Sequence, residues 1–404
     1  MRSKKTCGLQ DGLDEESLMK NPHLTWVEID AGALRDNLQR FRNLVGPEVL
    51  LSVVVKANAY GHGVAEIATL AVQAGADWLA VESLTEGMSL RELGLQCPIL
   101  LLGNVQLAEL QEVVQAELRL TVFNLETLEE LDKVVGRLHR NAPVHLKVET
   151  GMNRRGMLLE RLPEALNLIQ SSEYIQLEGL CSHLATADEP DNPSYAQVQL
   201  DNFRRAVVEV KGQGIQVPIK HLLNSAGTSL LEGAHFDMVR VGISTYGLWP
   251  SDPARRACLE KSIGPQSLTP VLTWKTRVIQ VKEIPAGSYI GYGRTFQTTR
   301  ATRLAALPIG YSDGYDRKLS NRGDVLIRGK RAPVRGRVSM NVTMVDITDI
   351  PGVRLEDEVV LLGRQGENEI TADELAALLE TINYEVVTRI NWALPKVMVH
   401  QNEV

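Results

Sequence analysis

The sequence predicts an α/β barrel followed by a smaller, mainly β domain. Between residues 50 and 245, eight short apolar runs alternate with longer segments of helical periodicity. The runs are continuously apolar, which is typical of strands buried on both faces of a parallel sheet, and eight such units favour a TIM-like (β/α)8 barrel. After about residue 262, short β-type runs are separated by Gly, Pro and Asp. A doubly wound open sheet is the alternative for the first part.

The eight predicted barrel strands are the apolar runs themselves. In order they are "LLSVVV" (50–55), "WLAVE" (78–82), "PILLLG" (98–103), "LRLTVF" (118–123), "VHLKVE" (144–149), "LEGLCSH" (177–183), "IKHLLN" (219–224) and "MVRVGIS" (238–244). Between them, segments such as "TEGMSLRELGL" (85–95) and "NLETLEELDKVVGRL" (124–138) have apolar residues three and four positions apart. This spacing predicts amphipathic helices that cover the barrel.

The rest of the chain divides into a leader, one separate strand and the β domain. Residues 1–24 are basic and then acidic without an apolar signal segment, and we expect a disordered leader. The alternating run in 25–32 lies outside the eight barrel runs and is expected to pair with the β domain. The predicted barrel covers 33–261 and the β domain 262–404, with a helical pattern at 371–382.

Composition excludes several classes of partner. The net charge of −7 and the pI near 5.7 give no overall electrostatic attraction to nucleic acid or to an anionic membrane surface. The four cysteines lack CxxC spacing and the eight histidines form no metal-binding motif, so neither a disulfide framework nor a metal site is expected. A reducing cytoplasm and a small-molecule partner fit this composition.

Polar residues collect where the predicted strands end. They are Lys56, Tyr60 and His62, then Lys147 and Arg154, His183, Asn224 and Ser225, and Arg240 with Gly242. Active sites of (β/α)8 barrels lie at these ends, often with a phosphate bound after the last two strands. A lysine facing a phosphate site predicts pyridoxal phosphate held as a Schiff base, although a sugar-phosphate aldolase remains open. Neither a complete GxGxxG nor a GxxxxGK motif is present.

The segment "VVVKANAYGHG" (53–63) closely resembles the pyridoxal-phosphate signature of alanine racemases. The resemblance extends from about residue 25 to about 398 through motifs in the family's order: "KVETGMNRRG", "HLATADE", "NSAGT", "VRVGISTYG", "IGYGRTF", "IGYSDGY" and "GRVSMNVTMVDIT". It implies the cofactor pyridoxal 5'-phosphate, an amino-acid substrate and a homodimer. In that dimer, the β domain of each subunit packs over the barrel of the other.

The resemblance also implies a two-base racemisation of alanine that supplies D-alanine for peptidoglycan. Lys56 would hold the cofactor and serve one face of the amino acid, and Tyr292 would serve the other face in the partner's active site. Two bases on opposite faces of a planar intermediate invert the carbon without turning the substrate over.

Further roles follow from the same resemblance. Arg240 would hydrogen-bond the pyridine nitrogen, His183 would orient Arg240, and Arg154 would contact the cofactor and the substrate carboxylate. Lys147 matches a position that is carbamylated in some members. The remaining implied residues are Tyr60, Ser225, Gly242 and Ile243 for the phosphate, and Tyr311 and Met340 for the substrate.

Two positions depart from the family pattern. Asn341 stands where many members have Asp, and Trp392 stands where many have a Tyr whose hydroxyl reaches the phosphate. Serine or broad-range racemisation therefore remains an alternative. A decarboxylase on the same architecture would be expected to carry a cysteine in the β domain, and none follows Cys258. A non-catalytic pyridoxal-phosphate carrier would be a lone barrel.

Overall fold

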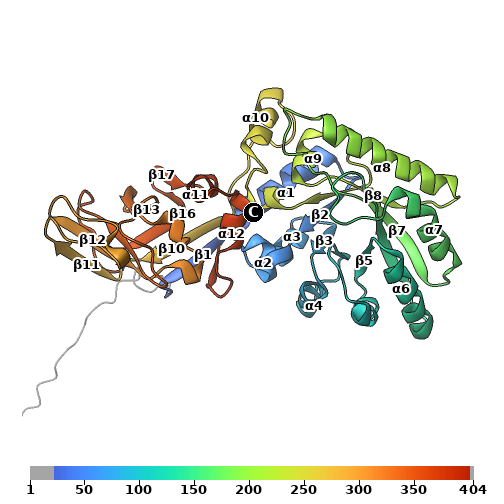
Figure 1. The fold of residues 1–404 in the computed structure, drawn as a ribbon, viewed down its shortest axis with the longest axis horizontal. Helices are drawn as coiled ribbons and strands as arrows, with labels where there is room; N and C mark the ends of the chain where they lie inside the picture. The colour runs from blue at the N-terminus through green and yellow to red at the C-terminus, as the bar shows by residue number, and fades with distance from the viewer. Residues whose placement is uncertain (1–21, 401–404) are drawn as a thin grey trace, which may run out of the picture.

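The structure is a computed structural model that describes residues 22–400. Figure 1 shows two lobes, the barrel with its surrounding helices and a flatter domain rich in strands. The leader predicted for residues 1–24 lies outside the described residues, apart from its last three positions.

The first lobe contains eight parallel strands. They are β2 (Leu50–Val54), β3 (Trp78–Val81), β4 (Ile99–Leu101), β5 (Arg119–Val122), β6 (Ala142–Lys147), β7 (Ile175–Cys181), β8 (Ile219–His221) and β9 (Met238–Val241). Each strand from β2 to β8 neighbours the next along the chain, and β9 pairs with β2. Between β8 and β9, the Asp237 N–H donates to the Lys220 carbonyl (3.0 Å) and the Arg240 N–H to the Leu223 carbonyl (3.1 Å).

This strand order distinguishes the two folds that the sequence allowed. In a doubly wound sheet the order reverses at an internal strand, whereas here the last strand lies beside the first. The barrel prediction is therefore confirmed, with the ring nearly closed, and the open-sheet alternative is wrong.

Helices surround the barrel (Figure 1). In chain order they are α1 (Ala31–Val45), α2 (Lys56–Tyr60), α3 (Val64–Gln73), α4 (Leu84–Glu92), α5 (Leu110–Gln115), α6 (Leu125–Leu138), α7 (Leu162–Ser171), α8 (Ser194–Gly212), α9 (Ser225–Leu230) and α10 (Asp252–Lys261). Helix α6 shows why the periodicity was informative: Asn124 caps it by accepting from the Thr127 N–H (2.8 Å), and its apolar face, including Leu128 and Leu131, is buried.

The second lobe contains two sheets. The larger one has the order β14 (Lys330–Pro333), β13 (Asp324–Ile327), β16 (Glu358–Gln365), β10 (Leu272–Arg277), β1 (Thr25–Asp30) and β18 (Lys396–Val399), with β17 (Asn368–Ile370) paired to β16. The smaller one joins β11 (Gln280–Ile284), β12 (Thr302–Leu307) and β15 (Thr343–Asp346). Helices α11 (Ala372–Leu379) and α12 (Asn383–Thr388) lie between β17 and β18 in the chain.

Strand β1 precedes the barrel in sequence but belongs to the second lobe (Figure 1). It pairs antiparallel with β10 and parallel with β18. The chain passes directly from β1 into α1, because Asp30 ends the strand and caps the helix by accepting from the Ala33 N–H (2.9 Å). The two lobes are thus connected twice, by the passage from β1 into α1 and by the segment between α10 and β10.

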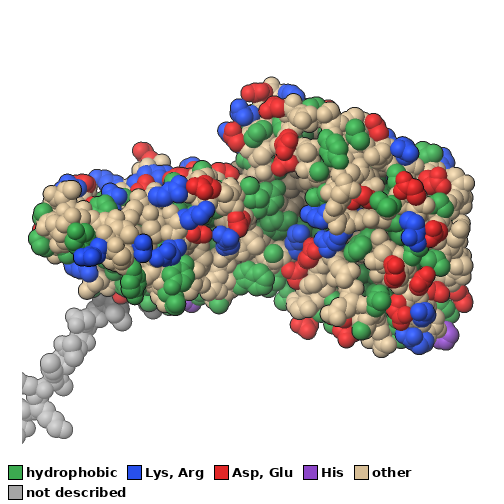
Figure 2. All heavy atoms as spheres, viewed as in Figure 1, with side chains coloured by type: hydrophobic (Ala, Val, Ile, Leu, Met, Phe, Trp, Pro, Cys, Tyr) green, Lys and Arg blue, Asp and Glu red, His purple; other side chains and the backbone are tan. Residues whose placement is uncertain are grey.

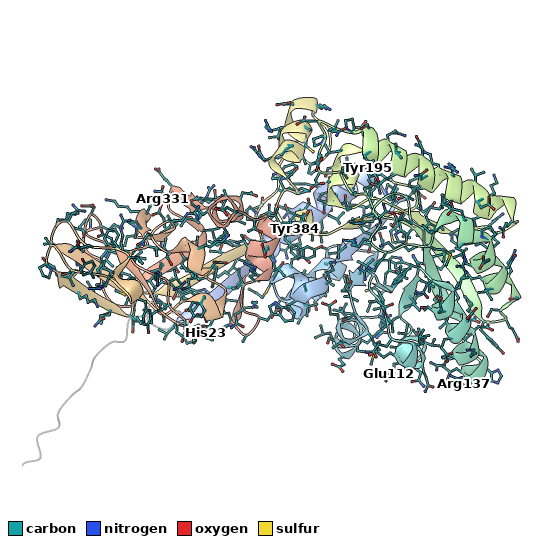
Figure 3. The ribbon with its side chains drawn as sticks, in the orientation of Figure 1. His23, Glu112, Arg137, Tyr195, Arg331 and Tyr384 are labelled. Atoms are coloured by element: carbon teal, nitrogen blue, oxygen red, sulfur yellow. The ribbon has the colours of Figure 1, made fainter. Side chains whose placement is uncertain are left out.

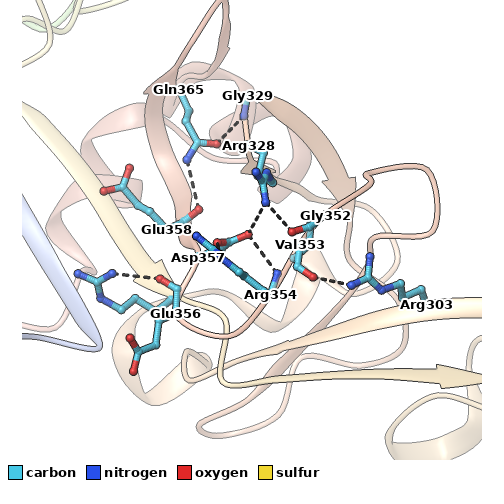
Figure 4. A network of polar contacts seen from close by, with 11 residues as sticks. Arg303, Arg328, Gly329, Gly352, Val353, Arg354, Glu356, Asp357, Glu358 and Gln365 are labelled. Carbon is cyan, nitrogen blue, oxygen red and sulfur yellow. Dashed lines mark hydrogen bonds and ion pairs between the residues drawn. The ribbon is translucent and has the colours of Figure 1, made fainter. Parts of the chain in front are cut away.

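Arginines fix the segment that links β15 to β16, as Figure 4 shows. Arg328 donates to the Gly352 carbonyl and lies 3.4 Å from Asp357, while Arg303, on β12, donates to the Val353 carbonyl. Because ion pairs exposed to water stabilise little, the bonds to backbone carbonyls matter more here. They tie the smaller sheet to the larger one.

Candidate functional site

A cavity of about 290 Å³ lies at the carboxyl ends of the barrel strands. Figure 2 shows Lys and Arg side chains gathered on the barrel where the surface is hollowed near the junction of the lobes. The nine site residues predicted on the barrel all line this cavity: Lys56, Tyr60, Lys147, Arg154, His183, Ser225, Arg240, Gly242 and Ile243. With Arg155 the lining holds five cationic side chains, and Glu82 is its one acid. The cavity is therefore suited to an anionic ligand.

Lys56 begins an unusual turn directly after β2. The four residues that follow it, 57–60, all have φ near 53°, the left-handed region that costs a non-glycine residue about 1–2 kcal/mol. Two side chains hold the turn: Glu86 accepts from the Ala57 N–H (2.6 Å), and Asn58 accepts from the Val64 N–H (2.8 Å). This geometry places both Lys56 and Tyr60 in the cavity lining.

The amine of Lys56 has a carboxylate partner that the sequence analysis missed. Glu82, at the end of β3, lies 3.2 Å from Lys56 Nζ and accepts from Arg155 (2.9 Å). Burial alone would raise the pKa of Glu82, but the charges of Lys56 and Arg155 hold it below its usual value. Glu82 is thus ionised at neutral pH. A signal for it existed, because it is the one charged residue at the end of the run "WLAVE".

The lining also holds hydroxyl and backbone groups suited to a phosphate, at Tyr60, Ser225 and Gly242. The Ser225 hydroxyl oxygen accepts from the Gly242 N–H (2.9 Å). A Cβ on Gly242 would lie 2.6 Å from the Tyr60 hydroxyl, so this position requires glycine. Burial, reinforced by the charge of Glu82, raises the pKa of Tyr60 above its usual value and keeps its hydroxyl a donor.

Arg240 is a buried residue of the cavity lining and is held by several acceptors. Its guanidinium donates to the carbonyls of Ser182 (2.7 Å) and Leu222 (3.1 Å) and to His221 Nδ1. The contact with His183, predicted from the family resemblance, spans 3.4 Å, and the shorter contact with His221 was not foreseen. Burial and the charge of Arg240 lower the pKa of both histidines, so both are neutral at pH 7.

The amine of Lys147 loses its proton more readily than that of an ordinary lysine. Burial lowers its pKa to about 8, and the neighbouring guanidiniums of Arg240, Arg154 and Arg155 act in the same direction, opposed by Cys181.

Three predicted residues lie outside the cavity of the single chain. Tyr292, Tyr311 and Met340 belong to the β domain, and their exposed fractions are 72%, 44% and 55%. Large apolar side chains this exposed are candidates for an interface. Asn341 lies beside them and donates to the Ser312 hydroxyl (2.8 Å).

The expectation for Trp392 is wrong in this structure. Trp392 is 58% exposed and does not line the cavity, because Asn391 before it is bonded to the backbone of Ser312 and Asp313 in the β domain. Besides Tyr60, a second tyrosine lines the cavity: Tyr384, on α12, which Figure 3 places where the two lobes meet. Its ring lies 6.2 Å from that of Tyr60. Tyr384 carried no strand-end signal because it lies in a helix.

Two other features, a metal site and a membrane-spanning helix, are absent from residues 22–400. No group of His, Cys, Asp and Glu residues there is arranged to hold a metal ion. No helix in the described part of the chain is long and apolar enough to cross a membrane.

The fold and the cavity define a two-domain barrel enzyme with a lysine and an anion-binding pocket at the barrel mouth. The family model "Alanine racemase, N-terminal domain" matches residues 29–250, and "Alanine racemase, C-terminal domain" matches residues 271–398. The chain belongs to the alanine racemase family.

Individual relatives match over nearly their whole length. The alanine racemase of Symbiobacterium thermophilum is 45% identical over 372 residues, 92% of this chain and 96% of the relative. The crystal structure of the Bacillus anthracis alanine racemase with bound L-Ala-P has a TM-score of 0.88 and 34% identity, covering 95% of this chain and 97% of that one. That of Bartonella henselae, with covalently bound pyridoxal phosphate, has a TM-score of 0.82 and 28% identity, covering 94% and 100%.

Proposed function

We propose that the protein binds pyridoxal 5'-phosphate in the barrel cavity through Lys56 and interconverts L- and D-alanine. The observation that carries this proposal is one cavity that combines a lysine, hydroxyl and backbone donors for a phosphate, and a buried arginine. The reaction would take place in the cytoplasm and supply D-alanine for the cell wall. The cytoplasmic location agrees with the described cysteines, Cys97, Cys181 and Cys258, which form no disulfide.

The residues present fit the cofactor. Tyr60, Ser225 and the backbone at Gly242 and Ile243 would hold its phosphate, with the Tyr384 hydroxyl nearby. The close approach of Tyr60 to Gly242 leaves no room for a side chain at that position, as a backbone cradle for a phosphate requires. When bound, pyridoxal phosphate withdraws electrons from the substrate and makes its α-proton removable.

Arg240 would face the ring nitrogen of the cofactor. Its guanidinium has five N–H groups, and the contacts with Ser182, Leu222 and His221 leave donors for a further acceptor. Because a guanidinium does not readily give up its proton, it would hold the ring nitrogen by a hydrogen bond without protonating it. Arg154, which lines the cavity and is exposed at its rim, would bind the substrate carboxylate.

Two bases would act on opposite faces of the substrate. Lys56 Nζ would remove or return the α-proton on one face, and the Tyr292 hydroxyl would do so on the other. Since Tyr292 is exposed on the β domain and absent from the cavity of its own chain, it would serve the cavity of a second copy in a homodimer. Tyr311 and Met340, exposed on the same domain, would contact the substrate there.

Chiral analysis of the products tests the reaction and the substrate range. The purified protein with pyridoxal phosphate is incubated with single enantiomers of alanine, serine and other amino acids, and both enantiomers are quantified over time. We expect equal amounts of L- and D-alanine at the end point, from either starting enantiomer. A protein that turns over serine but leaves alanine unchanged would contradict the proposal, as would carbon dioxide release without inversion.

We predict that Lys147 forms a carbamate. Carbon dioxide reacts with the neutral amine, and with a pKa of about 8, about half of Lys147 is neutral at pH 8 but only about one in a hundred at pH 6. The neighbouring Arg154 and Arg155 would stabilise the resulting anion. Carbon-13 NMR in labelled bicarbonate should show a protein-bound carbonyl at pH 8 that weakens towards pH 6. Its persistence in Lys147→Ala would contradict the assignment.

A further inference from the structure

A chain of hydrogen bonds crosses the barrel interior and ends at Arg240. The Glu178 carboxylate lies 3.2 Å from His145 Nε2, and His145 Nδ1 lies 2.7 Å from His221 Nε2. His221 Nδ1 in turn contacts the Arg240 guanidinium. Both histidines are fully buried, whereas Glu178 is partly exposed and also lies 3.4 Å from Arg119. This series of hydrogen bonds thus links Glu178, a carboxylate outside the cavity, to Arg240 in the cavity lining.

The backbone of β7 is shaped to build this chain. Val144 pairs with Leu177 and His145 pairs with Gly179, so Glu178 is an extra residue in the β7 ladder. Such a bulge re-aims a side chain, and here it directs Glu178 towards His145. A Cβ on Gly179 would lie 2.2 Å from His145 Nδ1, so glycine at 179 is needed for the imidazole to occupy its place. Two adjacent residues, Glu178 and Gly179, therefore accommodate one histidine.

The direction of every hydrogen bond in the chain is determined. A guanidinium can only donate, so His221 Nδ1 accepts from Arg240 and the proton of neutral His221 is on Nε2. That N–H donates to His145 Nδ1, which leaves the proton of His145 on Nε2, directed at Glu178. Burial lowers the pKa of both imidazoles, although the hydrogen bond and charge of Glu178 oppose this for His145, and both are neutral.

Arg240 has no carboxylate in direct contact among the described residues. Its hydrogen-bond partners are the Ser182 and Leu222 carbonyls and the histidines at 183 and 221. Glu82, the acid of the cavity lining, is held by Lys56 and Arg155. The hydrogen bonds that run from Arg240 through His221 and His145 therefore end at the Glu178 carboxylate, the final acceptor.

We propose that Glu178 is a positioning residue for Arg240: as the terminal acceptor it fixes the tautomers of His145 and His221, and thereby the orientation of the guanidinium. The proposal rests on the proposed function in that Arg240 faces the ring of the cofactor. Nothing in the cavity itself would reveal this role, because Glu178 does not line it.

Two substitutions of Glu178 distinguish the effect of its hydrogen-bond acceptor from the effect of its negative charge. In Glu178→Gln, the His145 and Arg119 N–H groups both require an acceptor, so the amide oxygen takes the place of the carboxylate oxygen and the tautomers persist. In Glu178→Leu no acceptor remains, His145 is free to change tautomer, and Arg240 loses its fixed orientation. Glu173→Gln, at an exposed position shortly before β7, is the matched control.

Three readouts are measured on each variant. Nitrogen-15 NMR of histidine-labelled apoprotein should show protonated Nε2 at His145 and His221 in wild type and Glu178→Gln, and a changed pattern in Glu178→Leu. The absorbance maximum of bound pyridoxal phosphate should shift in Glu178→Leu alone. Its kcat for alanine should fall by about 10- to 100-fold with little change in KM, since misplacement of a group by about 1 Å costs this much.

The decisive comparison is whether Glu178→Gln keeps the wild-type tautomers, spectrum and kcat that Glu178→Leu is expected to lose. The proposal is overturned if Glu178→Leu keeps the wild-type tautomers, spectrum and kcat, or if Glu178→Gln loses as much as Glu178→Leu. His145→Phe interrupts the chain at its middle and should reproduce the spectral shift and the loss of kcat, so the test remains decisive should Glu178→Leu not fold. The NMR readout needs neither cofactor nor substrate, and a wild-type protein with the expected tautomers but no alanine turnover would overturn the proposed function alone.

Discussion

Lys56→Ala is expected to abolish alanine racemisation, with a fall of at least about a thousandfold in kcat, and to leave no covalently held cofactor. In the proposed mechanism the lysine is both the anchor for the cofactor and the base for one face of the substrate, so one substitution would remove two functions. The fold should be unaffected, because the left-handed turn after Lys56 is held by Glu86 and Asn58.

The measurement combines chiral analysis with borohydride reduction followed by peptide mass determination. In the wild type the reduced cofactor should be attached to the peptide that contains Lys56. Lys133→Ala, which changes an exposed lysine on α6, is the matched control and should retain full activity. Reduced cofactor attached elsewhere in the wild type, or still attached in Lys56→Ala, would contradict the assignment.

Tyr292→Phe is expected to reduce racemisation in both directions by about 100- to 10,000-fold, since it removes one proton carrier and leaves the ring. The two directions must fall together, because the equilibrium constant between enantiomers is one. The face served by Lys56 remains functional. In deuterated water, one enantiomer of alanine should therefore still exchange its α-proton while the other does not.

Tyr289→Phe provides the control for this experiment. Tyr289 is also exposed and lies three residues before Tyr292, with its ring under Arg294. It should racemise alanine at the wild-type rate. Equal exchange of both enantiomers by Tyr292→Phe would mean that the hydroxyl of Tyr292 is not the second base.

The barrel was predictable because burial on both faces leaves a direct mark in the sequence. The run "MVRVGIS", for example, contains all of β9 and places Arg240 near the strand's end. Strand β1 was recognisable as separate because its residues alternate, with Val27 and Ile29 buried and Glu28 between them partly exposed. Its partners β10 and β18 lie far along the chain, and a local pattern predicts a strand without identifying its neighbours.

The site was predictable where it depends on strand ends and less so elsewhere. Lys56 follows β2 and Ser225 follows β8, so fold topology alone brings them to one face of the barrel. Tyr384 reaches the cavity from a helix of the other lobe, which no strand pattern indicates. His221 was overlooked because an imidazole within a buried strand has no distinguishing local signal; only the three-dimensional contact with Arg240 reveals its role.

The central claim of the proposed mechanism is that Tyr292 serves the cavity of a second copy of the chain. Co-expression of Lys56→Ala with Tyr292→Phe under two affinity tags yields heterodimers in which one site collects both lesions and the other neither. We expect about half the wild-type activity per purified heterodimer, although each parent homodimer is nearly inactive. Heterodimers as inactive as the parents, while a wild-type dimer assembled with the same two tags is active, would show that Tyr292 acts within its own chain.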